Sequence, residues 1–129
     1  MLPVAISAEA KSAPSTVRFA AKLPSQIAGQ SRMTISARSP LVDGIGDSQG
    51  GGFFPAELKF AGWDMVIVEG AAPKPVYLLI TDGHAELVDA GHLWGKTVWE
   101  TEAEIKKAHQ DPQIRVAAIG RAGENRVLY

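Results

Sequence analysis

The chain has 129 residues, of which 46% are hydrophobic and 21% are charged, and this indicates one globular domain with a core of its own. The formal net charge of −1 excludes a strong overall field toward nucleic acid or an anionic membrane. The sequence contains no cysteine, which excludes disulfides, thiol catalysis, thiolate zinc sites and any iron–sulfur cluster held by this chain.

Residues 1–17 do not have the pattern of a targeting segment. Their short apolar start precedes a single lysine, Lys11, whereas a signal peptide begins with positive charge and has a longer apolar core. No stretch reaches the roughly 18 apolar residues that a membrane span needs. We therefore expect a cytoplasmic protein with a loosely ordered leader over residues 1–17 and no membrane or nucleic-acid partner.

Strands dominate the expected secondary structure. In "SRMTISAR", apolar residues alternate with polar ones, which is typical of a half-buried strand, and the other candidates are short apolar runs. Asp82–Gly83 predicts a two-residue hairpin turn between two of them. The predicted strands cover residues 31–38, 64–70, 75–81, 84–90 and 113–120. A turn over "RAGEN" and a final strand-like piece, "RVLY", follow them.

Two helices are predicted between these strands. The first is "PAELKFA", with Pro55 in its first turn, Glu57 near its positive end and Gly62 as its left-handed stop. The second runs from Val98 to His109 and begins at the capping box formed by Thr97 and Glu100. Because strands and helices do not alternate regularly, the fold class is α+β rather than a doubly wound sheet.

The sequence stops within the apolar stretch "RVLY", so we expect the domain to be incomplete. An unpaired strand there would favour a homodimer by edge pairing.

The most unusual segment contains three consecutive glycines, Gly50–Gly52. Successive glycines let backbone amides converge on a ligand, and the amides at the start of the following helix add positive potential. Arg32 and Arg38 lie on the polar face of the preceding strand and can supply bidentate contacts. This pattern favours a phosphate or another anion. The alternative is a glycine-rich turn that only reverses the chain, since neither nucleotide-binding glycine motif is present.

Other polar residues fit structural roles better than chemical ones. The acidic residues near the glycines lack a second convergent ligand cluster and suit turns and caps; they are Asp43, Asp47, Glu57 and Asp64. The histidines show no metal-ligand spacing; they are His84, His92 and His109. "GHLWGKT" and "IGRAGEN" each combine glycine with one basic residue, Lys96 or Arg121, but a turn is the simpler interpretation of both.

Taken together, the segments resemble the N-terminal domain of the aldehyde ferredoxin oxidoreductase family, the tungsten- or molybdenum-bis-pterin enzymes. The resemblance covers residues 18–129. The stretches that carry it are "SRMTISARSPLVDGIGDSQGGGFFPAELKFAGWDMVIVEG", "APKPVYLLITDGHAELVDAGHLWGKTVWETEAEIKK" and "VAAIGRAGENRV". It implies a β-rich, two-sheet, saddle-like domain on which the pterins lie, while cysteines of later domains hold an iron–sulfur cluster.

The resemblance also implies site residues. Arg32 matches an arginine that contacts cofactor phosphate, and Gly50 and Gly51 belong to the turn that faces the cofactor. Gln49 occupies the place of an asparagine whose backbone carbonyl helps to coordinate magnesium between the pterin phosphates. A carbonyl ligand survives this exchange, but asparagine tolerates left-handed backbone better than glutamine, so the turn can differ.

Two departures from the family pattern shape the functional hypothesis. An unrelated leader of 17 residues replaces the family's glycine-rich start, and the chain ends before the loop that supplies the other half of the phosphate site. We therefore expect the pterin-binding portion of an enzyme that oxidises an aldehyde to a carboxylic acid, inactive without its remainder. The remainder is either a separate subunit or missing domains, and ferredoxin is the electron acceptor of the whole enzyme. The alternatives are a stand-alone phosphate-binding module and a structural subunit of a larger oxidoreductase.

Overall fold

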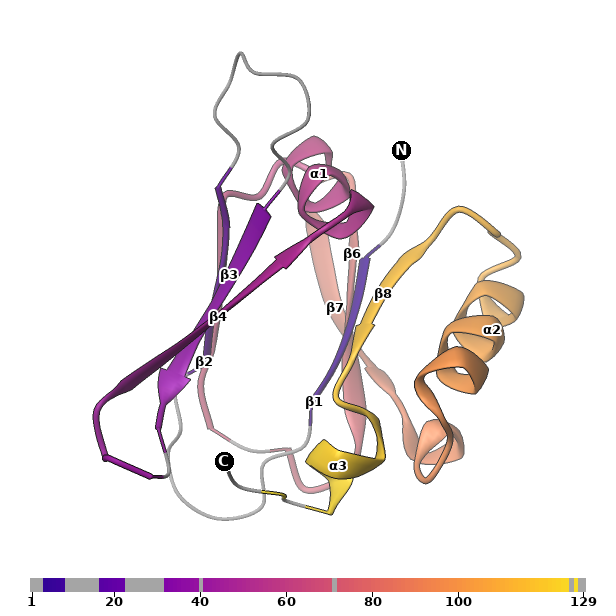
Figure 1. Ribbon diagram of the computed structural model, residues 1–129. Coiled ribbons are helices and arrows are strands. Elements are labelled where there is room, and N and C mark those ends of the chain that lie inside the picture. The colour runs from indigo at the N-terminus through magenta and orange to yellow at the C-terminus, as the bar shows by residue number, and fades with distance from the viewer. Residues whose placement is uncertain are drawn as a thin grey trace.

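The computed structural model describes residues 4–8, 17–22, 32–39, 41–70, 72–125 and 127. They form two four-stranded sheets with strand orders β7-β6-β1-β8 and β4-β3-β2-β5 (Figure 1). The first sheet contains β1 (Val4–Ala8), β6 (Val76–Thr81), β7 (His84–Asp89) and β8 (Arg115–Ala118). The second contains β2 (Val17–Lys22), β3 (Arg32–Arg38), β4 (Ile45–Gly51) and β5 (Met65–Val68).

The helices are short and lie around these sheets. They are α1 (Phe53–Phe60), η1 (Gly91–Leu93), α2 (Val98–Ala108) and α3 (Gly120–Glu124). All strand pairs are antiparallel except β1 with β8, which is parallel. The predicted class, an α+β domain rich in β structure with two sheets, is confirmed.

Helix α1 joins the two sheets. It contacts β2 and β3 of one sheet and β1 and β8 of the other. Leu58 of α1 and Ile80 of β6 are both fully buried, and they belong to one core cluster. The remaining buried members of this cluster are Met33, Ala61 and Val66. Because Met33 and Val66 come from the second sheet, the cluster fixes the end of the β3–β4 pair against the rest of the domain.

A second cluster lies under α2. Tyr77 and Leu79 of β6 pack with Ile105 of α2, and the other buried members are Ala90, Leu93 and Ile114. Odd-numbered residues of β6 thus face α2, while Ile80 faces the first cluster. Burial on both faces explains why "VYLLI" is a continuous apolar run rather than an alternating one.

The predicted caps and turns are confirmed where local chemistry decides the structure. Asp82 and Gly83 have φ values of 47° and 80°, as a type I′ hairpin turn requires. After α1, the Gly62 amide donates to Lys59 O at 3.0 Å and the Trp63 amide donates to Leu58 O at 3.1 Å. With Gly62 at φ 92°, these two bonds form a Schellman stop.

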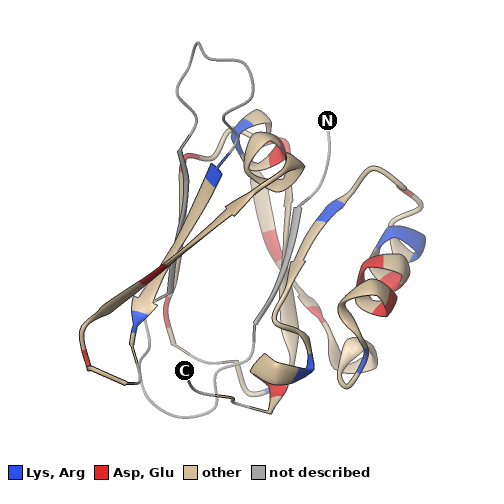
Figure 2. Cartoon of the chain, in the orientation of Figure 1, with Lys and Arg blue, Asp and Glu red and all other residues tan. Residues whose placement is uncertain are grey.

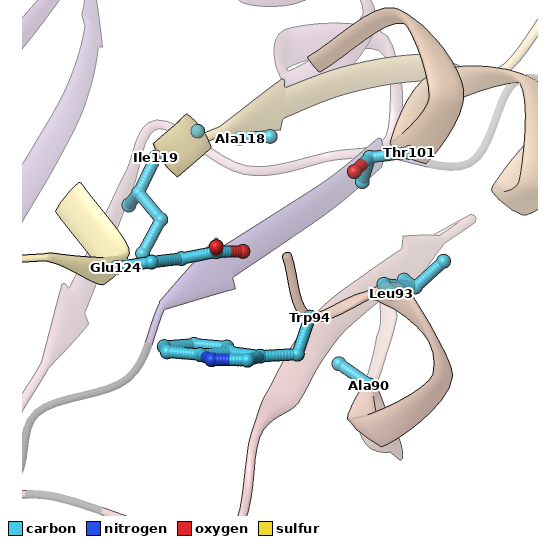
Figure 3. A pocket seen from close by; sticks show the side chains of 8 residues that line it. Ala90, Leu93, Trp94, Thr101, Ala118, Ile119 and Glu124 are labelled. Atoms are coloured by element: carbon cyan, nitrogen blue, oxygen red, sulfur yellow. The ribbon is translucent and has the colours of Figure 1, made fainter. Parts of the chain in front are cut away.

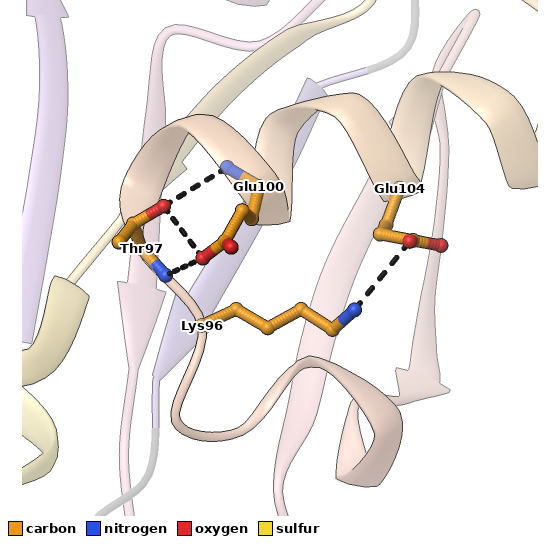
Figure 4. A network of polar contacts seen from close by, with 4 residues as sticks. All are labelled: Lys96, Thr97, Glu100 and Glu104. Atoms are coloured by element: carbon orange, nitrogen blue, oxygen red, sulfur yellow. Dashed lines mark hydrogen bonds and ion pairs between the residues drawn. The ribbon is translucent and has the colours of Figure 1, made fainter.

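The capping box of α2 is also present (Figure 4). The Glu100 amide donates to Thr97 Oγ1 at 3.3 Å, and the Thr97 amide donates to Glu100 Oε2 at 2.7 Å. Hydrogen bonds from the backbone and then the side chain of Thr97 lower the pKa of the Glu100 carboxyl. Lys96 lies just before the helix, and its Nζ is 3.4 Å from Oε1 of Glu104, which lies one turn beyond Glu100.

Several local predictions were wrong. The glycine-rich segment, where no strand was predicted, is strand β4, because its backbone pairs with β3 from Arg38↔Ile45 to Arg32↔Gly51. Helix α1 begins at Phe53 rather than Pro55, so Glu57 lies beyond the first turn, which contains no acidic residue. The "RAGEN" turn is part of the short helix α3.

The predictions for the N-terminal leader and for the final strand are not decided by the structure. Within residues 1–17 the structure describes Val4–Ala8 and Val17, and β1 lies between β6 and β8, an element that the composition of this stretch did not suggest. The division at residue 17 stays a prediction. The expected last strand, residues 126–129, lies outside the described residues apart from Val127, so edge pairing through it is untested.

Candidate anion-binding site

Two of the predicted site residues meet at one end of the β3–β4 pair. Arg32 is the first residue of β3 and lies opposite Gly51, while Gln49 lies opposite Thr34. Arg32 Nη1 donates a hydrogen bond to Gln49 Oε1 at 3.1 Å, and both side chains are exposed. No carboxylate pairs with Arg32 in the described part of the chain. The remaining guanidinium donors therefore stay available to an anion.

The structure gives different reasons for glycine at the three positions of Gly50–Gly52. Gly52 has φ 110° and ψ −160°, a conformation that residues with a side chain rarely adopt. Gly50 and Gly51 have no positive φ, and a Cβ at Gly50 would meet Met33 Cε only at 3.9 Å, an ordinary contact. The backbone geometry requires Gly52, whereas neither backbone conformation nor crowding requires Gly50. A bare backbone at Gly50 is consistent with close approach by a ligand.

Helix α1 starts directly after these glycines. Its N-cap, Gly52, makes no side-chain hydrogen bond to the first turn, and Pro55 in that turn has no amide hydrogen. The amides of Phe53 and Phe54 consequently have no capping side chain at Gly52. The positive end of the helix dipole thus adds to the charge of Arg32 at the same end of the strand pair.

Arg115, for which the sequence predicted no role, approaches α1 from the first sheet. Its Cζ lies 4.8 Å from the centre of the Phe53 ring, a cation–π contact at the first residue of α1. Its Nε is buried and has no hydrogen-bond partner among the described residues. In Figure 2 the basic segments at the starts of β3 and β8 both lie toward the α1 end of the molecule. A basic residue at the head of an otherwise apolar strand was the only sequence signal for it.

The acidic residues near the glycines have structural partners. Asp43 pairs with Arg38, Asp64 pairs with Lys59, and the Asp47 carboxylate accepts a hydrogen bond from the Ser36 hydroxyl. Within the described ranges no three histidine, cysteine or acidic side chains group as a metal site would require. The predicted turn role fits Asp43, whereas Asp64 forms an ion pair and Asp47 a side-chain hydrogen bond in place of the predicted caps.

His109 also has a structural role. It is the C-cap of α2, and its Nε2 lies 2.8 Å from the Tyr77 hydroxyl oxygen of β6. Burial, and secondarily the charge of Glu86, raises the pKa of the Tyr77 hydroxyl, so this phenol stays neutral. The contact ties the end of α2 to the first sheet.

The segments "GHLWGKT" and "IGRAGEN" contact each other. The Gly95 amide donates to both Glu124 carboxylate oxygens, at 3.1 Å and 3.0 Å, and Arg121 Nε donates to Gly95 O at 3.1 Å. A Cβ at Gly123 would lie 2.6 Å from Ile119 Cβ, so the tight α3 turn requires glycine there. Glu124 and Trp94 reach toward the small recess between the segments (Figure 3). The polar groups of the two segments thus bond to each other and have structural roles, although "IGRAGEN" contains helix α3 rather than only the expected turn.

Among the residues the structure describes, none of the helices has the length and apolar character of a membrane span.

Comparison with known proteins places this arrangement in a family. The sequence model described as "Aldehyde ferredoxin oxidoreductase, N-terminal domain" matches residues 14–129. The chain is 51% identical over 98 residues to the tungsten-containing aldehyde ferredoxin oxidoreductase of Thermococcus kodakarensis, and 50% identical to that of Pyrococcus furiosus. Each alignment covers 76% of this chain and 16% of the relative, so the chain spans about one sixth of their length.

Two further relatives have other names. The "Aliphatic sulfonate oxidoreductase, WOR-like subunit" of Pyrococcus furiosus is 33% identical in an alignment of 110 positions that covers 76% of this chain and 18% of that protein. A solved structure, the active site complex BamBC of benzoyl coenzyme A reductase with 1,5-dienoyl-CoA, superposes with a TM-score of 0.82 at 43% identity. That superposition covers 89% of this chain and 18% of the other.

Proposed function

The chain belongs to the aldehyde ferredoxin oxidoreductase family, and from that premise we propose that it is the pterin-cofactor-binding portion of an oxidoreductase of this type. The observation that carries the proposal is the convergence of Arg32, Gln49 and Gly50–Gly52 at the start of α1. A tungsten cofactor is supported by the names of the relatives, and molybdenum remains the alternative metal.

The residues present fit a phosphorylated pterin. Arg32 offers guanidinium donors that no described carboxylate occupies, and Gln49 holds its side chain in place from one side. A Cβ at Gly52 would meet nothing within 4 Å, and the flanking Gly50 and Gly51 leave β4 without side chains there. We propose that Arg32 binds a cofactor phosphate and that the glycine backbone lies against the pterin.

We propose in addition that the Gln49 backbone carbonyl is one ligand of a magnesium ion shared with cofactor phosphates. Magnesium prefers oxygen ligands in octahedral geometry and often takes several of them from phosphate or water. One carbonyl ligand from this chain is compatible with that coordination preference. Such a site requires no cluster of carboxylates on this chain.

The remainder of the enzyme would supply the other functions. When bound, the metal–pterin group supplies the two-electron oxidation of the substrate, while the residues of this chain bind and orient it. An iron–sulfur cluster held outside this chain and a ferredoxin acceptor complete our proposal for the whole enzyme. We expect this chain alone to be inactive, and a cytoplasmic location remains a prediction.

The names of three relatives support a role in cofactor binding rather than in substrate choice. The relatives are named for an aldehyde, an aliphatic sulfonate and a coenzyme A thioester, yet all share this domain. A part common to enzymes with different substrates is suited to hold what they have in common. The names "subunit" and "complex" also favour the second candidate, a subunit of a larger oxidoreductase.

A titration of the purified chain with magnesium and inorganic pyrophosphate tests the proposed site, with pyrophosphate standing in for the cofactor phosphates. Gly51→Val places a branched side chain beside Arg32, and we expect it to weaken binding by at least about tenfold, a free-energy change of about 1.4 kcal/mol. Gly46→Val is the matched control, because Gly46 lies in the same strand, has no positive φ, and has ordinary contacts at 3.7 Å around its Cβ position.

Circular dichroism and urea unfolding establish that both variants fold. Equal loss of pyrophosphate binding in the two variants, or no binding by the wild-type chain, would contradict the proposed site. An aldehyde-dependent viologen assay addresses the inactivity of the isolated chain separately, and turnover with retained tungsten would overturn that part.

A further inference from the structure

The turn between β3 and β4 concentrates large exposed side chains. Leu41, Val42 and Ile45 are 80%, 70% and 83% exposed. Single exposed apolar residues are normal on soluble proteins and need no explanation. Three exposed aliphatic side chains thus lie within five residues of one turn, which we call the hairpin tip. Surfaces of this kind mark interaction sites more often than chance placement.

The hairpin tip has a defined backbone structure. The Ser39 amide donates to Gly44 O at 2.8 Å, and the Asp43 amide donates to Ser39 O at 3.0 Å. Ser39 Oγ accepts hydrogen bonds from the amides of Leu41 and Val42 at 3.3 Å and 3.5 Å. The turn thus holds the apolar side chains outward before any partner arrives, which lowers the entropic cost of binding.

The charges of the tip indicate the kind of surface that covers it. Arg38 and Asp43 form an ion pair with each other at the base of the turn. The tip consequently presents no unpaired charge to a partner, which disfavours nucleic acid or an anionic membrane. An apolar recess on a protein is the surface that suits it.

The family comparison supplies the argument for one partner, the rest of the enzyme. The chain matches the N-terminal domain, and it spans 16% of the tungsten-containing relatives. Most of the polypeptide in those enzymes therefore lies outside the matched region. The tip and the candidate anion site occupy opposite ends of the same two strands, since Arg38 pairs with Ile45 near the tip and Arg32 pairs with Gly51 at the site. A partner can cover the tip without covering the site.

We propose that the hairpin tip docks into an apolar recess on the downstream polypeptide of an aldehyde ferredoxin oxidoreductase-type enzyme. That polypeptide is supplied either in the same chain or as a separate subunit. The inference rests on the family membership and not on the proposed cofactor site, so either can fail alone.

Site-specific photocross-linking tests the docking. The full 129-residue chain carries p-benzoylphenylalanine at position 41 and is irradiated in an extract of the organism that encodes it. Position 87 is the matched control, because Leu87 is a leucine of similar exposure, 70%, on the edge strand β7. We expect cross-links from position 41 to peptides of a family polypeptide downstream of its N-terminal domain, identified by mass spectrometry, with a yield at least about fivefold above position 87.

A binding measurement gives the second readout. The triple variant Leu41→Ser/Val42→Ser/Ile45→Ser should bind the cross-linked polypeptide at least about tenfold more weakly than the wild type, while Leu87→Ser should match the wild type. Both variants should retain the wild-type circular dichroism and urea unfolding curves, because the changed side chains are exposed. Cross-links only to a second copy of this chain, none from position 41, or equal yields at the two positions would overturn the proposal.

Discussion

The two ends of the β3–β4 hairpin differ in every property that matters for binding. At the open end, Arg32, Gln49 and Gly50–Gly52 present a guanidinium group and bare backbone beside the start of α1. At the tip, Leu41, Val42 and Ile45 present an apolar surface whose neighbouring charges pair with each other. The same pair of strands thus carries a polar site and an apolar surface at opposite ends of a ladder of seven residue pairs.

The difference also extends to support from the core. Met33, next to Arg32 in β3, is buried in the cluster around Leu58 of α1, so the open end is fixed to the domain. The tip relies on its own hydrogen bonds. A site that must hold several ligand contacts in register benefits from a rigid base, whereas a docking element needs only a defined turn.

The largest expected effect tests this difference in support. Leu58→Ala removes a fully buried side chain and should lower the free energy of unfolding by about 2–5 kcal/mol, because it leaves a cavity beneath the open end. Leu41→Ala, the same substitution at the tip, should change it by less than about 0.5 kcal/mol. Urea unfolding followed by circular dichroism measures both, and similar losses would show that the tip is packed after all.

The glycines provide the next comparison. Gly52→Ala places a side chain at φ 110° and should cost about 1–3 kcal/mol of unfolding free energy. Gly44→Ala near the tip has no positive φ and room for a Cβ, with Val42 Cγ2 at 3.8 Å, so its effect should be less than about 1 kcal/mol. Thermal and urea unfolding report the difference, and a harmless Gly52→Ala would remove the conformational reason given for that glycine.

A change outside the hairpin gives a reference of intermediate size. Thr97→Ala removes the N-cap of α2 and should cost about 1 kcal/mol at neutral pH, without affecting either end of β3–β4. Pyrophosphate binding by this variant should equal that of the wild type. Weaker binding would mean that the open end depends on α2 as well as on α1.

The same cap predicts a pH dependence. The folded-state pKa of Glu100 lies below its ordinary value of 4.5, so its hydrogen bonds contribute stability above that value. This contribution is lost as the pH falls through the depressed folded-state pKa. The wild type should therefore lose more stability than Thr97→Ala between neutral pH and that acidic range. Parallel unfolding curves of the two proteins at every pH would contradict the assignment.

The smallest expected effect lies at the tip. Asp43→Asn breaks the exposed ion pair with Arg38 but keeps a residue that tolerates the left-handed φ of 59°. The unfolding free energy should change by no more than about 0.5 kcal/mol, because exposed ion pairs contribute little. A larger loss would show that the turn depends on the ion pair rather than on its backbone hydrogen bonds.

The sequence predicted those features that local chemistry determines. The Asp82–Gly83 turn, the Thr97–Glu100 box and the Gly62 stop each depend on residues within a few positions. Strand β4 was not predicted because its glycines have low strand propensity. Its pairing with β3 outweighs that propensity in the structure. Strand β1 was not predicted because its pairing partners, β6 and β8, lie about 70 or more residues away along the chain.

For the candidate site, the sequence predicted Arg32, Gln49 and the glycines but not the contacts among them. The contact between Arg32 and Gln49 follows from the β3–β4 register, which propensities do not give. Arg115 joins Phe53 only because α1 packs across both sheets. The sequence contains the apolar residues of the tip in "PLVDGI", but only the structure shows that their side chains are exposed.

The central claim is that the open end of the hairpin binds an anionic cofactor, and it can be tested within one strand. Arg32 and Arg38 are the two ends of β3 and both are exposed. In a magnesium–pyrophosphate titration by calorimetry, we predict that Arg32→Gln raises the Kd at least about tenfold, since hydrogen bonds to charged groups contribute about 1.5–3 kcal/mol. Arg38→Gln should leave the Kd within about twofold. Equal effects of the two substitutions, or an unchanged Kd for Arg32→Gln, would contradict the account.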